Sequence, residues 1–155
     1  MERVVKRLIE LNKTISTMES CTGGALASAI TNIPDASKVI KFSAVTYSNE
    51  YKIKMGVSED LIKEYSVYSV EVANDMAKVI SNYTNSDYGV GITGKLKKFD
   101  ESNPYGEEDI VYLSIYDKDN DDYYHEKIKL TRDNRIECKE EIIKHFIDKI
   151  MVLLK

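Results

Sequence analysis

The order of helical and extended patterns along the chain constrains its fold most strongly. In the earlier part of the chain, segments with helical spacing alternate with short apolar runs, and two extended runs joined by a short acidic turn follow later. Alternation of this kind is typical of parallel strands connected by helices, whereas a tight turn joins antiparallel strands. We therefore expect an α/β fold, a three-layer α/β/α sandwich with a mixed sheet, forming a single domain over residues 1–155.

The individual elements follow from residue spacing and from residues that begin or end helices. Helices are expected over 2–12, 22–32, from Ser48 to Gly56, after Ser58, from Ser69 to Ser81, and over 136–154. Strands are expected over 14–18, 42–47, 88–93, 110–116 and 123–130. The first strand leads into the second helix through a short polar turn.

That turn lies within the stretch TMESCTGG, residues 17–24. A small polar turn between a strand and a helix leaves backbone N–H groups unpaired at the helix start, and these donors and the helix dipole favour negative charge. A nucleophilic hydroxyl or thiol in such a turn has anion donors beside it. Ser20 and Cys21 are therefore candidate reactive residues.

Three polar clusters fall at expected strand ends or helix starts, where ligands bind in open α/β sheets. They are Ser20–Gly24, Tyr47–Lys52 and Gly91–Gly94. A serine nucleophile needs a base, and neither His125, in the expected hairpin, nor His145, on the closing helix, is a suitable one. A lysine can act as the base where burial or a nearby cation favours its neutral form, so Lys52 is the candidate.

The motifs TMESCTGG, VTYSNEYK, VYSVEVANDMA and GITG, in this order and spacing, resemble the CinA carboxy-terminal domain. This competence/damage-inducible family includes the nicotinamide mononucleotide deamidases, and the resemblance runs from the first expected helix to the last. It implies hydrolysis of the carboxamide of nicotinamide mononucleotide to nicotinic acid mononucleotide and ammonia. The implied partner is this small mononucleotide, and neither a metal nor a cofactor is expected.

The resemblance also implies roles for individual residues. Ser20 is expected to be the nucleophile and Lys52 its base, with Tyr47 and Thr93 as polar partners near the pair. The implied substrate-binding residues are Cys21, Thr22, Gly23, Gly24, Asn49, Gly94 and Arg135, of which Arg135 faces the substrate phosphate. We therefore expect the Lys52 ammonium nitrogen within hydrogen-bond reach of the Ser20 hydroxyl, directly or through one water.

Cys21 competes with Ser20 for the role of nucleophile, because a thiol is intrinsically the more reactive group. Consecutive residues in a turn usually point to different sides, so only one of the two can face a pocket. The residues alone leave the choice open, and the family resemblance favours Ser20.

The segment after Gly94 departs from the family pattern. Where the family continues with Ala-Gly-Pro and further glycines, this chain reads KLKKFDESNPYGEED. Lys95, Lys97 and Lys98 either attract a phosphate as flexible point charges or belong to a solvated charged loop. The missing glycines support an alternative function, a catalytically silent module of the same family that binds a nucleotide or a protein partner.

Composition narrows the class of partner and the cellular setting. A net charge of −4 provides no global basic field, which argues against nucleic acid or an anionic membrane as partner. No apolar run approaches the roughly 18 residues of a membrane span, and the amino terminus lacks the apolar run of a signal peptide. The two cysteines, Cys21 and Cys138, fit neither a disulfide framework nor a zinc motif. We expect a cytoplasmic protein. Its 11 tyrosines either favour contacts in a homo-oligomer or are strand residues.

The acidic turn DKDNDD, residues 117–122, has the composition of a calcium loop. It lacks the central glycine and the bidentate terminal glutamate that such loops use. We therefore expect a solvated turn between two strands.

Overall fold

The computed structural model describes residues 1–97 and 107–155 of the 155-residue chain. Its helices are α1 (Glu2–Glu10), α2 (Ala25–Thr31), the 3-10 helix η1 (Ala36–Lys38), α3 (Asn49–Lys54), α4 (Glu59–Tyr65), α5 (Val70–Thr84) and α6 (Arg135–Leu153). Its strands are β1 (Ile15–Glu19), β2 (Ile40–Val45), β3 (Tyr88–Gly94), β4 (Ile110–Asp117) and β5 (Asp122–Lys129). Each expected helix and strand is present, with bounds shifted by a few residues. In the described part of the chain, no helix has both the length and the apolar character needed to cross a membrane.

The strands form one sheet in the order β2-β1-β3-β4-β5. β1 pairs in parallel with β2 and β3, whereas β4 runs antiparallel to both β3 and β5. The parallel part is the one in which helices separate the strands along the chain, and the antiparallel part contains the hairpin. The expected mixed sheet is therefore confirmed.

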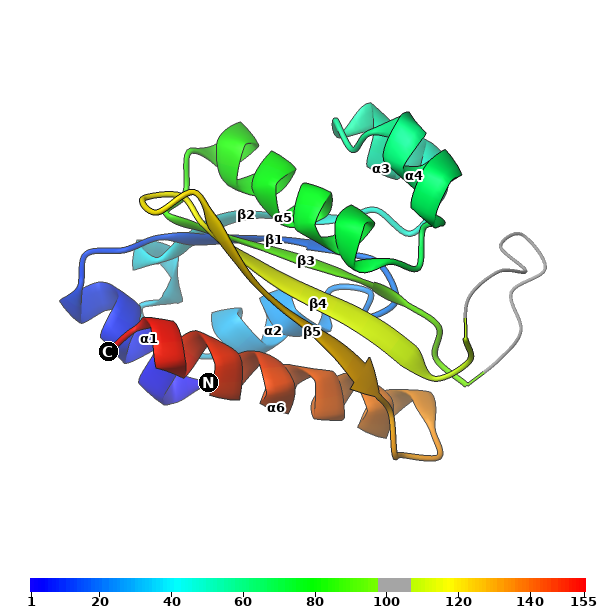
Figure 1. Ribbon diagram of the computed structural model, residues 1–155. Helices are drawn as coiled ribbons and strands as arrows, with labels where there is room; N and C mark the ends of the chain where they lie inside the picture. Colours follow the sequence, from blue (N-terminus) through cyan, green and yellow to red (C-terminus); the bar gives the residue numbers. More distant parts are fainter. Residues whose placement is uncertain (98–106) are drawn as a thin grey trace.

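Helices cover both faces of the sheet (Figure 1). α1, α2 and α6 lie on one face, and α5 lies on the other together with the short helices α3 and α4. The first face buries a core that includes Leu8, Ile30 and Phe146, and the second buries a smaller core that includes Met18 and Met76. This arrangement confirms the expected three-layer sandwich.

Two glycines allow α5 to pack directly against β3. A Cβ atom added at Gly89 would lie 1.9 Å from the carbonyl oxygen of Ala77, and one at Gly91 would lie 2.1 Å from that of Ala73. Atoms cannot approach this closely, so a side chain at either position forces the helix and the strand apart. The close approach fixes α5 against the strand that ends at the candidate site.

We expect Gly89→Ala to lower the free energy of unfolding by about 3 kcal/mol, because the obstructing atom is backbone and cannot rotate away. Urea denaturation followed by circular dichroism measures this change. Ser28→Ala, on the exposed side of α2, is the control and should alter stability by no more than about 0.5 kcal/mol. A Gly89→Ala protein as stable as the wild type would mean that α5 can shift at little cost.

The second helix begins later than its sequence pattern predicts. Gly23 and Gly24 have φ angles of 60° and 92°, in the left-handed region that residues with a side chain rarely adopt. The turn therefore continues through Gly24, and α2 begins at Ala25 rather than at residue 22. Backbone conformation therefore favours glycine at both positions, most strongly at Gly24, because the described residues with a side chain and a positive φ lie between 48° and 71°.

The acidic turn between β4 and β5 is held by hydrogen bonds and ion pairs within the chain. Asp117 accepts a hydrogen bond from the backbone N–H of Asp119 at 3.1 Å. Asp121 accepts from the Lys78 ammonium at 2.8 Å and from the Tyr116 hydroxyl at 2.7 Å, and these bonds lower its pKa. Among the residues that the structure describes, no group of three or more His, Cys, Asp or Glu could hold a metal ion.

Candidate active site

The candidate site lies at the carboxyl ends of the three parallel strands. Ser20 follows β1, Thr46 follows β2 and Lys95 follows β3. β1 lies between the other two strands, and the chain leaves it through α2 on one face but enters β3 from α5 on the other. In open α/β sheets, ligands bind where the connections change direction in this way.

Ser20 and Lys52 come together at this edge of the sheet. The Lys52 ammonium nitrogen donates to Ser20 Oγ at 3.0 Å and to the carbonyl oxygen of Thr46 at 2.8 Å. Lys52 is 1% exposed and Ser20 is 8% exposed. The expected hydrogen-bond contact is confirmed, and it is direct.

Local sequence explains why Lys52 points towards the sheet. Ser48 caps α3, because its hydroxyl oxygen accepts from the backbone N–H of Tyr51 and its carbonyl oxygen accepts from that of Lys52. With the first turn fixed, Lys52 is buried while Tyr51 and Lys54 are exposed. Removal of an ammonium group from water disfavours its charged form, which is the condition under which a lysine can accept a proton.

Glu19 occupies the helix terminus that the sequence assigns to an anionic ligand. Its buried carboxylate accepts hydrogen bonds from the N–H groups of Leu26 at 3.0 Å and Ala27 at 2.9 Å, in the first turn of α2. A carboxylate in this place pairs the open donors and interacts favourably with the helix dipole. The sequence predicted that N–H groups at the start of this helix are open to an anionic ligand. For Leu26 and Ala27 this prediction is wrong, because the Glu19 carboxylate already accepts from both.

The backbone amides of Cys21 and Thr22 remain as donors beside Ser20. Within residues 1–97 and 107–155, neither donates to a backbone carbonyl oxygen, whereas the amide of Gly23 donates to that of Ser20 at 3.0 Å. The buried Thr22 hydroxyl also has no hydrogen-bond partner in this part of the chain. Unpaired donors next to a nucleophile are the groups that an oxyanion requires.

Cys21 lacks the properties of a nucleophile. Its side chain is buried, and burial raises the pKa of the thiol to about 12, although the Lys52 ammonium acts in the opposite direction. The thiolate, which is the reactive form of cysteine, is therefore scarce at neutral pH. Ser20, unlike Cys21, contacts Lys52 directly.

We expect Cys21 to resist thiol reagents in the folded protein. At pH 8, a thiol with a pKa of about 12 is ionised in about one molecule in 10⁴. Titration with dithionitrobenzoate in a Cys138→Ala background should show a slow thiol in the native protein and a fast one in urea. Rapid labelling of native Cys21 would contradict the burial argument.

Arg135 joins the site from the first turn of α6. Asn134 caps this helix, since its side-chain oxygen accepts from the backbone N–H of Glu137 at 2.9 Å. The Arg135 guanidinium donates to the carbonyl oxygen of Leu96 at 2.7 Å and to the Tyr47 hydroxyl at 3.4 Å. The structure thus places Arg135 and the exposed Tyr47 together near the end of β3.

Thr93 and Gly94 have partners within the fold. The buried Thr93 hydroxyl donates to the carbonyl oxygen of Val67 at 2.9 Å, which ties β3 to the segment before α5. A Cβ atom at Gly94 would lie 2.5 Å from the carbonyl oxygen of Ile110, so glycine permits the close pairing of β3 with β4. Asn49 lies half-buried in the first turn of α3. Contacts of these three residues with substrate stay predictions.

Lys95 and Lys97, which follow β3, are not the flexible or solvated charges that the sequence suggests. Lys95 is 4% exposed, and its ammonium lies 5.0 Å from the centre of the Tyr68 ring. Lys97 pairs with Asp109 at 3.3 Å. Lys98 lies in the segment 98–106, outside the described residues. Lys95 is thus held by a cation–π contact and Lys97 by an ion pair, so neither is a free charge.

Lys139 also lies beside the site, although it is not among the site residues predicted from the sequence. Its ammonium nitrogen lies so close to Gly23 that a Cβ atom added there would come within 3.4 Å of it. Lys139 is half-buried on α6, one turn after Arg135. Their spacing of four residues places the two basic side chains on one face of the helix, which is the signal that could have identified Lys139.

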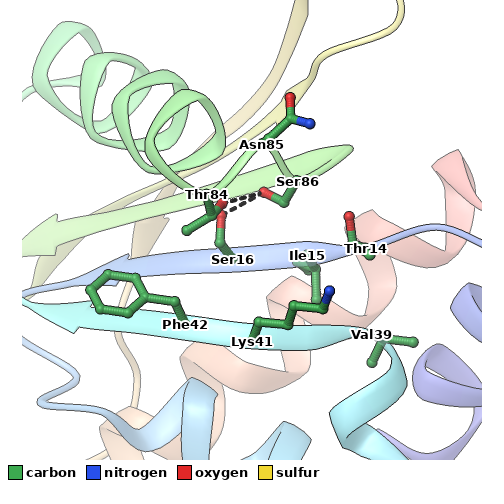
Figure 2. A pocket seen from close by; sticks show the side chains of 9 residues that line it. All are labelled: Thr14, Ile15, Ser16, Val39, Lys41, Phe42, Thr84, Asn85 and Ser86. Atoms are coloured by element: carbon green, nitrogen blue, oxygen red, sulfur yellow. Dashed lines mark hydrogen bonds between the residues drawn. The ribbon is translucent and has the colours of Figure 1, made fainter.

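A separate pocket of about 180 Å³ lies at the opposite, amino-terminal end of β1 and β2 (Figure 2). Its hydroxyl groups bond to one another: Ser16 and Ser86 lie 2.6 Å apart, and Thr84 donates to Ser86 at 3.0 Å. Ser86 donates in turn to the carbonyl oxygen of Tyr88 at 2.9 Å. The hydroxyl groups of this pocket therefore already have hydrogen-bond partners within the protein, unlike the backbone amides beside Ser20 in the described part of the chain. For this reason we take the turn beside Ser20, and not this pocket, as the candidate site.

The fold and the site together define an α/β domain with a mixed sheet and a buried serine–lysine pair at the ends of its parallel strands. The chain belongs to the CinA C-terminal domain family, whose model matches residues 1–154. This family membership relates the domain to competence/damage-inducible proteins.

Individual relatives agree with this assignment. The chain is 42% identical over 120 residues to a protein of Clostridium kluyveri named as competence-damage inducible, and 35% identical over 150 residues to one of Thermoanaerobacter sp.. These matches cover 76% and 96% of this chain but 29% and 35% of the relatives, so the chain spans about a third of their length. The crystal structure of competence/damage inducible protein CihA from Agrobacterium tumefaciens is similar, with a TM-score of 0.86, 25% identity, and coverage of 99% of this chain and 95% of that one.

Proposed function

We propose that this domain is an amidohydrolase that converts nicotinamide mononucleotide to nicotinic acid mononucleotide and ammonia. The observation that carries the proposal is the 3.0 Å contact between the Lys52 nitrogen and Ser20 Oγ in a buried setting. Lysine is seldom fully buried in proteins, because its charge is costly to remove from water. A buried lysine within hydrogen-bond distance of a serine hydroxyl can, in its neutral form, accept the hydroxyl proton, which is how a serine nucleophile is activated.

In the first step of the proposed reaction, neutral Lys52 takes the proton of the Ser20 hydroxyl as Oγ bonds to the carboxamide carbon. The carbonyl oxygen becomes an oxyanion, and the amides of Cys21 and Thr22 are the open donors nearest to it along the chain. The C–N bond then breaks, Lys52 gives its proton to the leaving nitrogen, and ammonia departs. Ser20 is left as an ester of the nicotinic acid group.

In the second step, a water molecule adds to the ester carbon and gives a proton to Lys52. The bond from carbon to Ser20 Oγ breaks, and Lys52 returns the proton to Oγ. Nicotinic acid mononucleotide leaves and the starting state is restored. The two steps together consume one water and release one ammonia.

The choice of substrate rests on two observations. The motifs that contain Ser20 and Lys52 resemble those of nicotinamide mononucleotide deamidases, and the substrate of these enzymes carries a carboxamide and a phosphate. Two basic residues, Arg135 and Lys139, lie beside the site and favour an anionic substrate.

Incubation of the purified protein with nicotinamide mononucleotide tests the proposal. We expect ammonia and nicotinic acid mononucleotide in equal amounts from the wild type and neither from Ser20→Ala. If the folded wild-type protein releases no ammonia, the proposed amidohydrolase activity is wrong. Binding of nicotinamide mononucleotide to that inactive protein, measured by calorimetry, would then support the silent binding module that the changed segment after Gly94 favours.

A further inference from the structure

We infer that Lys139 selects for a phosphate group on the substrate, while Arg135 acts chiefly to hold α6 against the site. The inference rests on the proposed function, because it assigns the part of the same site that recognises the anionic end of the substrate. It transfers to Lys139 a role that the family resemblance gives to Arg135.

Lys139 is a half-buried cation without a compensating charge. In the part of the chain that the structure describes, no carboxylate lies within ion-pair distance of its ammonium group. Two other basic residues of α6, His145 and Lys149, lie 2.8 and 3.6 Å from the carboxylate of Glu126. Arg135 and Lys144 resemble Lys139 in having no ion pair within the described residues, but Lys144 is exposed and Arg135 is held by two hydrogen bonds. An uncompensated cation in this position is available to an external anion.

The placement of the two basic residues on α6 is electrostatically unfavourable for the helix. Arg135 and Lys139 carry like charges at positions i and i+4, a spacing that destabilises a helix. Arg135 also lies in the first turn of this 19-residue helix, where the dipole disfavours positive charge. A bound anion would relieve both interactions.

The surroundings of Lys139 suit a phosphate. Its ammonium nitrogen lies over Gly23, within 3.4 Å of the position of an added Cβ atom. A phosphate oxygen bound by Lys139 would therefore sit beside Gly23, on the turn that carries Ser20.

The two basic side chains differ in how many of their donors are already in use. Arg135 donates from Nη1 to the carbonyl oxygen of Leu96 and from Nη2 to the Tyr47 hydroxyl. These two hydrogen bonds connect α6 to the end of β3 and to the segment after β2. The ammonium group of Lys139 has no hydrogen-bond partner in the described part of the chain. Arg135 keeps three of its five N–H donors, as many as the Lys139 ammonium has, but its two bonds fix the position of the guanidinium, whereas the Lys139 ammonium can move to meet a ligand.

Kinetics with nicotinamide mononucleotide and with nicotinamide riboside, which lacks the phosphate, test the inference. Lys139→Met should raise KM for the mononucleotide roughly 10- to 100-fold at nearly constant kcat and leave both constants for the riboside unchanged. Lys139→Arg should recover most of the affinity, because it restores the charge. Lys144→Met, an exposed lysine of the same helix, is the matched control and should behave as the wild type.

The comparison of the two substrates separates a failure of the Lys139 inference from a failure of the proposed function. Equal effects of Lys139→Met on both substrates, or no effect on either, would overturn the inference and leave the proposed function intact. If the wild type hydrolyses neither compound, the proposed function fails, and calorimetric binding of the two compounds replaces kinetics. In that case, Lys139→Met should bind the mononucleotide more weakly than the wild type does and bind the riboside equally well. Equal affinity of the wild type and Lys139→Met for the mononucleotide would overturn the inference, and so would a wild type that does not bind it.

Discussion

Replacement of Ser20 by alanine is expected to lower kcat for nicotinamide mononucleotide on the order of 10⁴-fold. The change removes the oxygen that bonds to the carboxamide carbon in the proposed mechanism. Cys21 cannot substitute for it, because burial raises the pKa of that thiol to about 12. An ammonia assay measures kcat, and thermal unfolding establishes that the variant is folded.

Cys21→Ala is the matched control for this prediction, because it changes the neighbouring residue in the same turn. We expect its kcat to stay within a few fold of the wild-type value, since Cys21 supplies the reaction only with its backbone amide. An active Ser20→Ala protein together with an inactive Cys21→Ala protein would reverse the assignment of the nucleophile.

The second large effect is expected for Lys52→Met, which should lower kcat on the order of 10³-fold, because general base catalysis contributes roughly 10²- to 10⁴-fold. Methionine approximates the length of the lysine stem and keeps the apolar packing, so the loss is attributable to the amine. Lys54→Met, on the exposed side of α3, is the matched control and should retain activity.

The same Lys52→Met protein separates a catalytic lysine from a structural one. Removal of the buried amine relieves its own desolvation cost but leaves the Thr46 carbonyl oxygen without this donor, so the free energy of unfolding should fall by no more than about 1–3 kcal/mol in urea denaturation. A protein that loses several kcal/mol of stability and keeps its kcat would make Lys52 a structural residue whose bond to the Thr46 carbonyl oxygen is its main contribution.

The fold was predictable because its determinants are local in the sequence. Ser48, Ser58 and Ser69 each cap the helix that follows, and each was identifiable from its position before a helical pattern. The antiparallel hairpin follows from two extended runs separated by a short turn. The start of α2 was missed by three residues because two consecutive left-handed glycines extend the turn, and spacing alone does not reveal backbone conformation.

The candidate site was predictable only in part. The contact between Ser20 and Lys52 follows from motifs that lie at the ends of adjacent strands, so their proximity was accessible from the sequence. The capping of α2 by Glu19 was not, because a carboxylate at the end of a strand can face either side of the sheet. The spacing of four residues from Arg135 could have identified Lys139 as a candidate, but its contact with Gly23 was not predictable, since that contact depends on how α6 packs across the sheet.

The most direct test of the central claim is mass spectrometry of the protein quenched in acid during turnover of nicotinamide mononucleotide. The proposed mechanism predicts a nicotinic acid mononucleotide ester on the peptide that contains Ser20, formed by the wild type and absent from Ser20→Ala. An ester on Cys21, or continued ammonia release by Ser20→Ala without any adduct, would contradict the account.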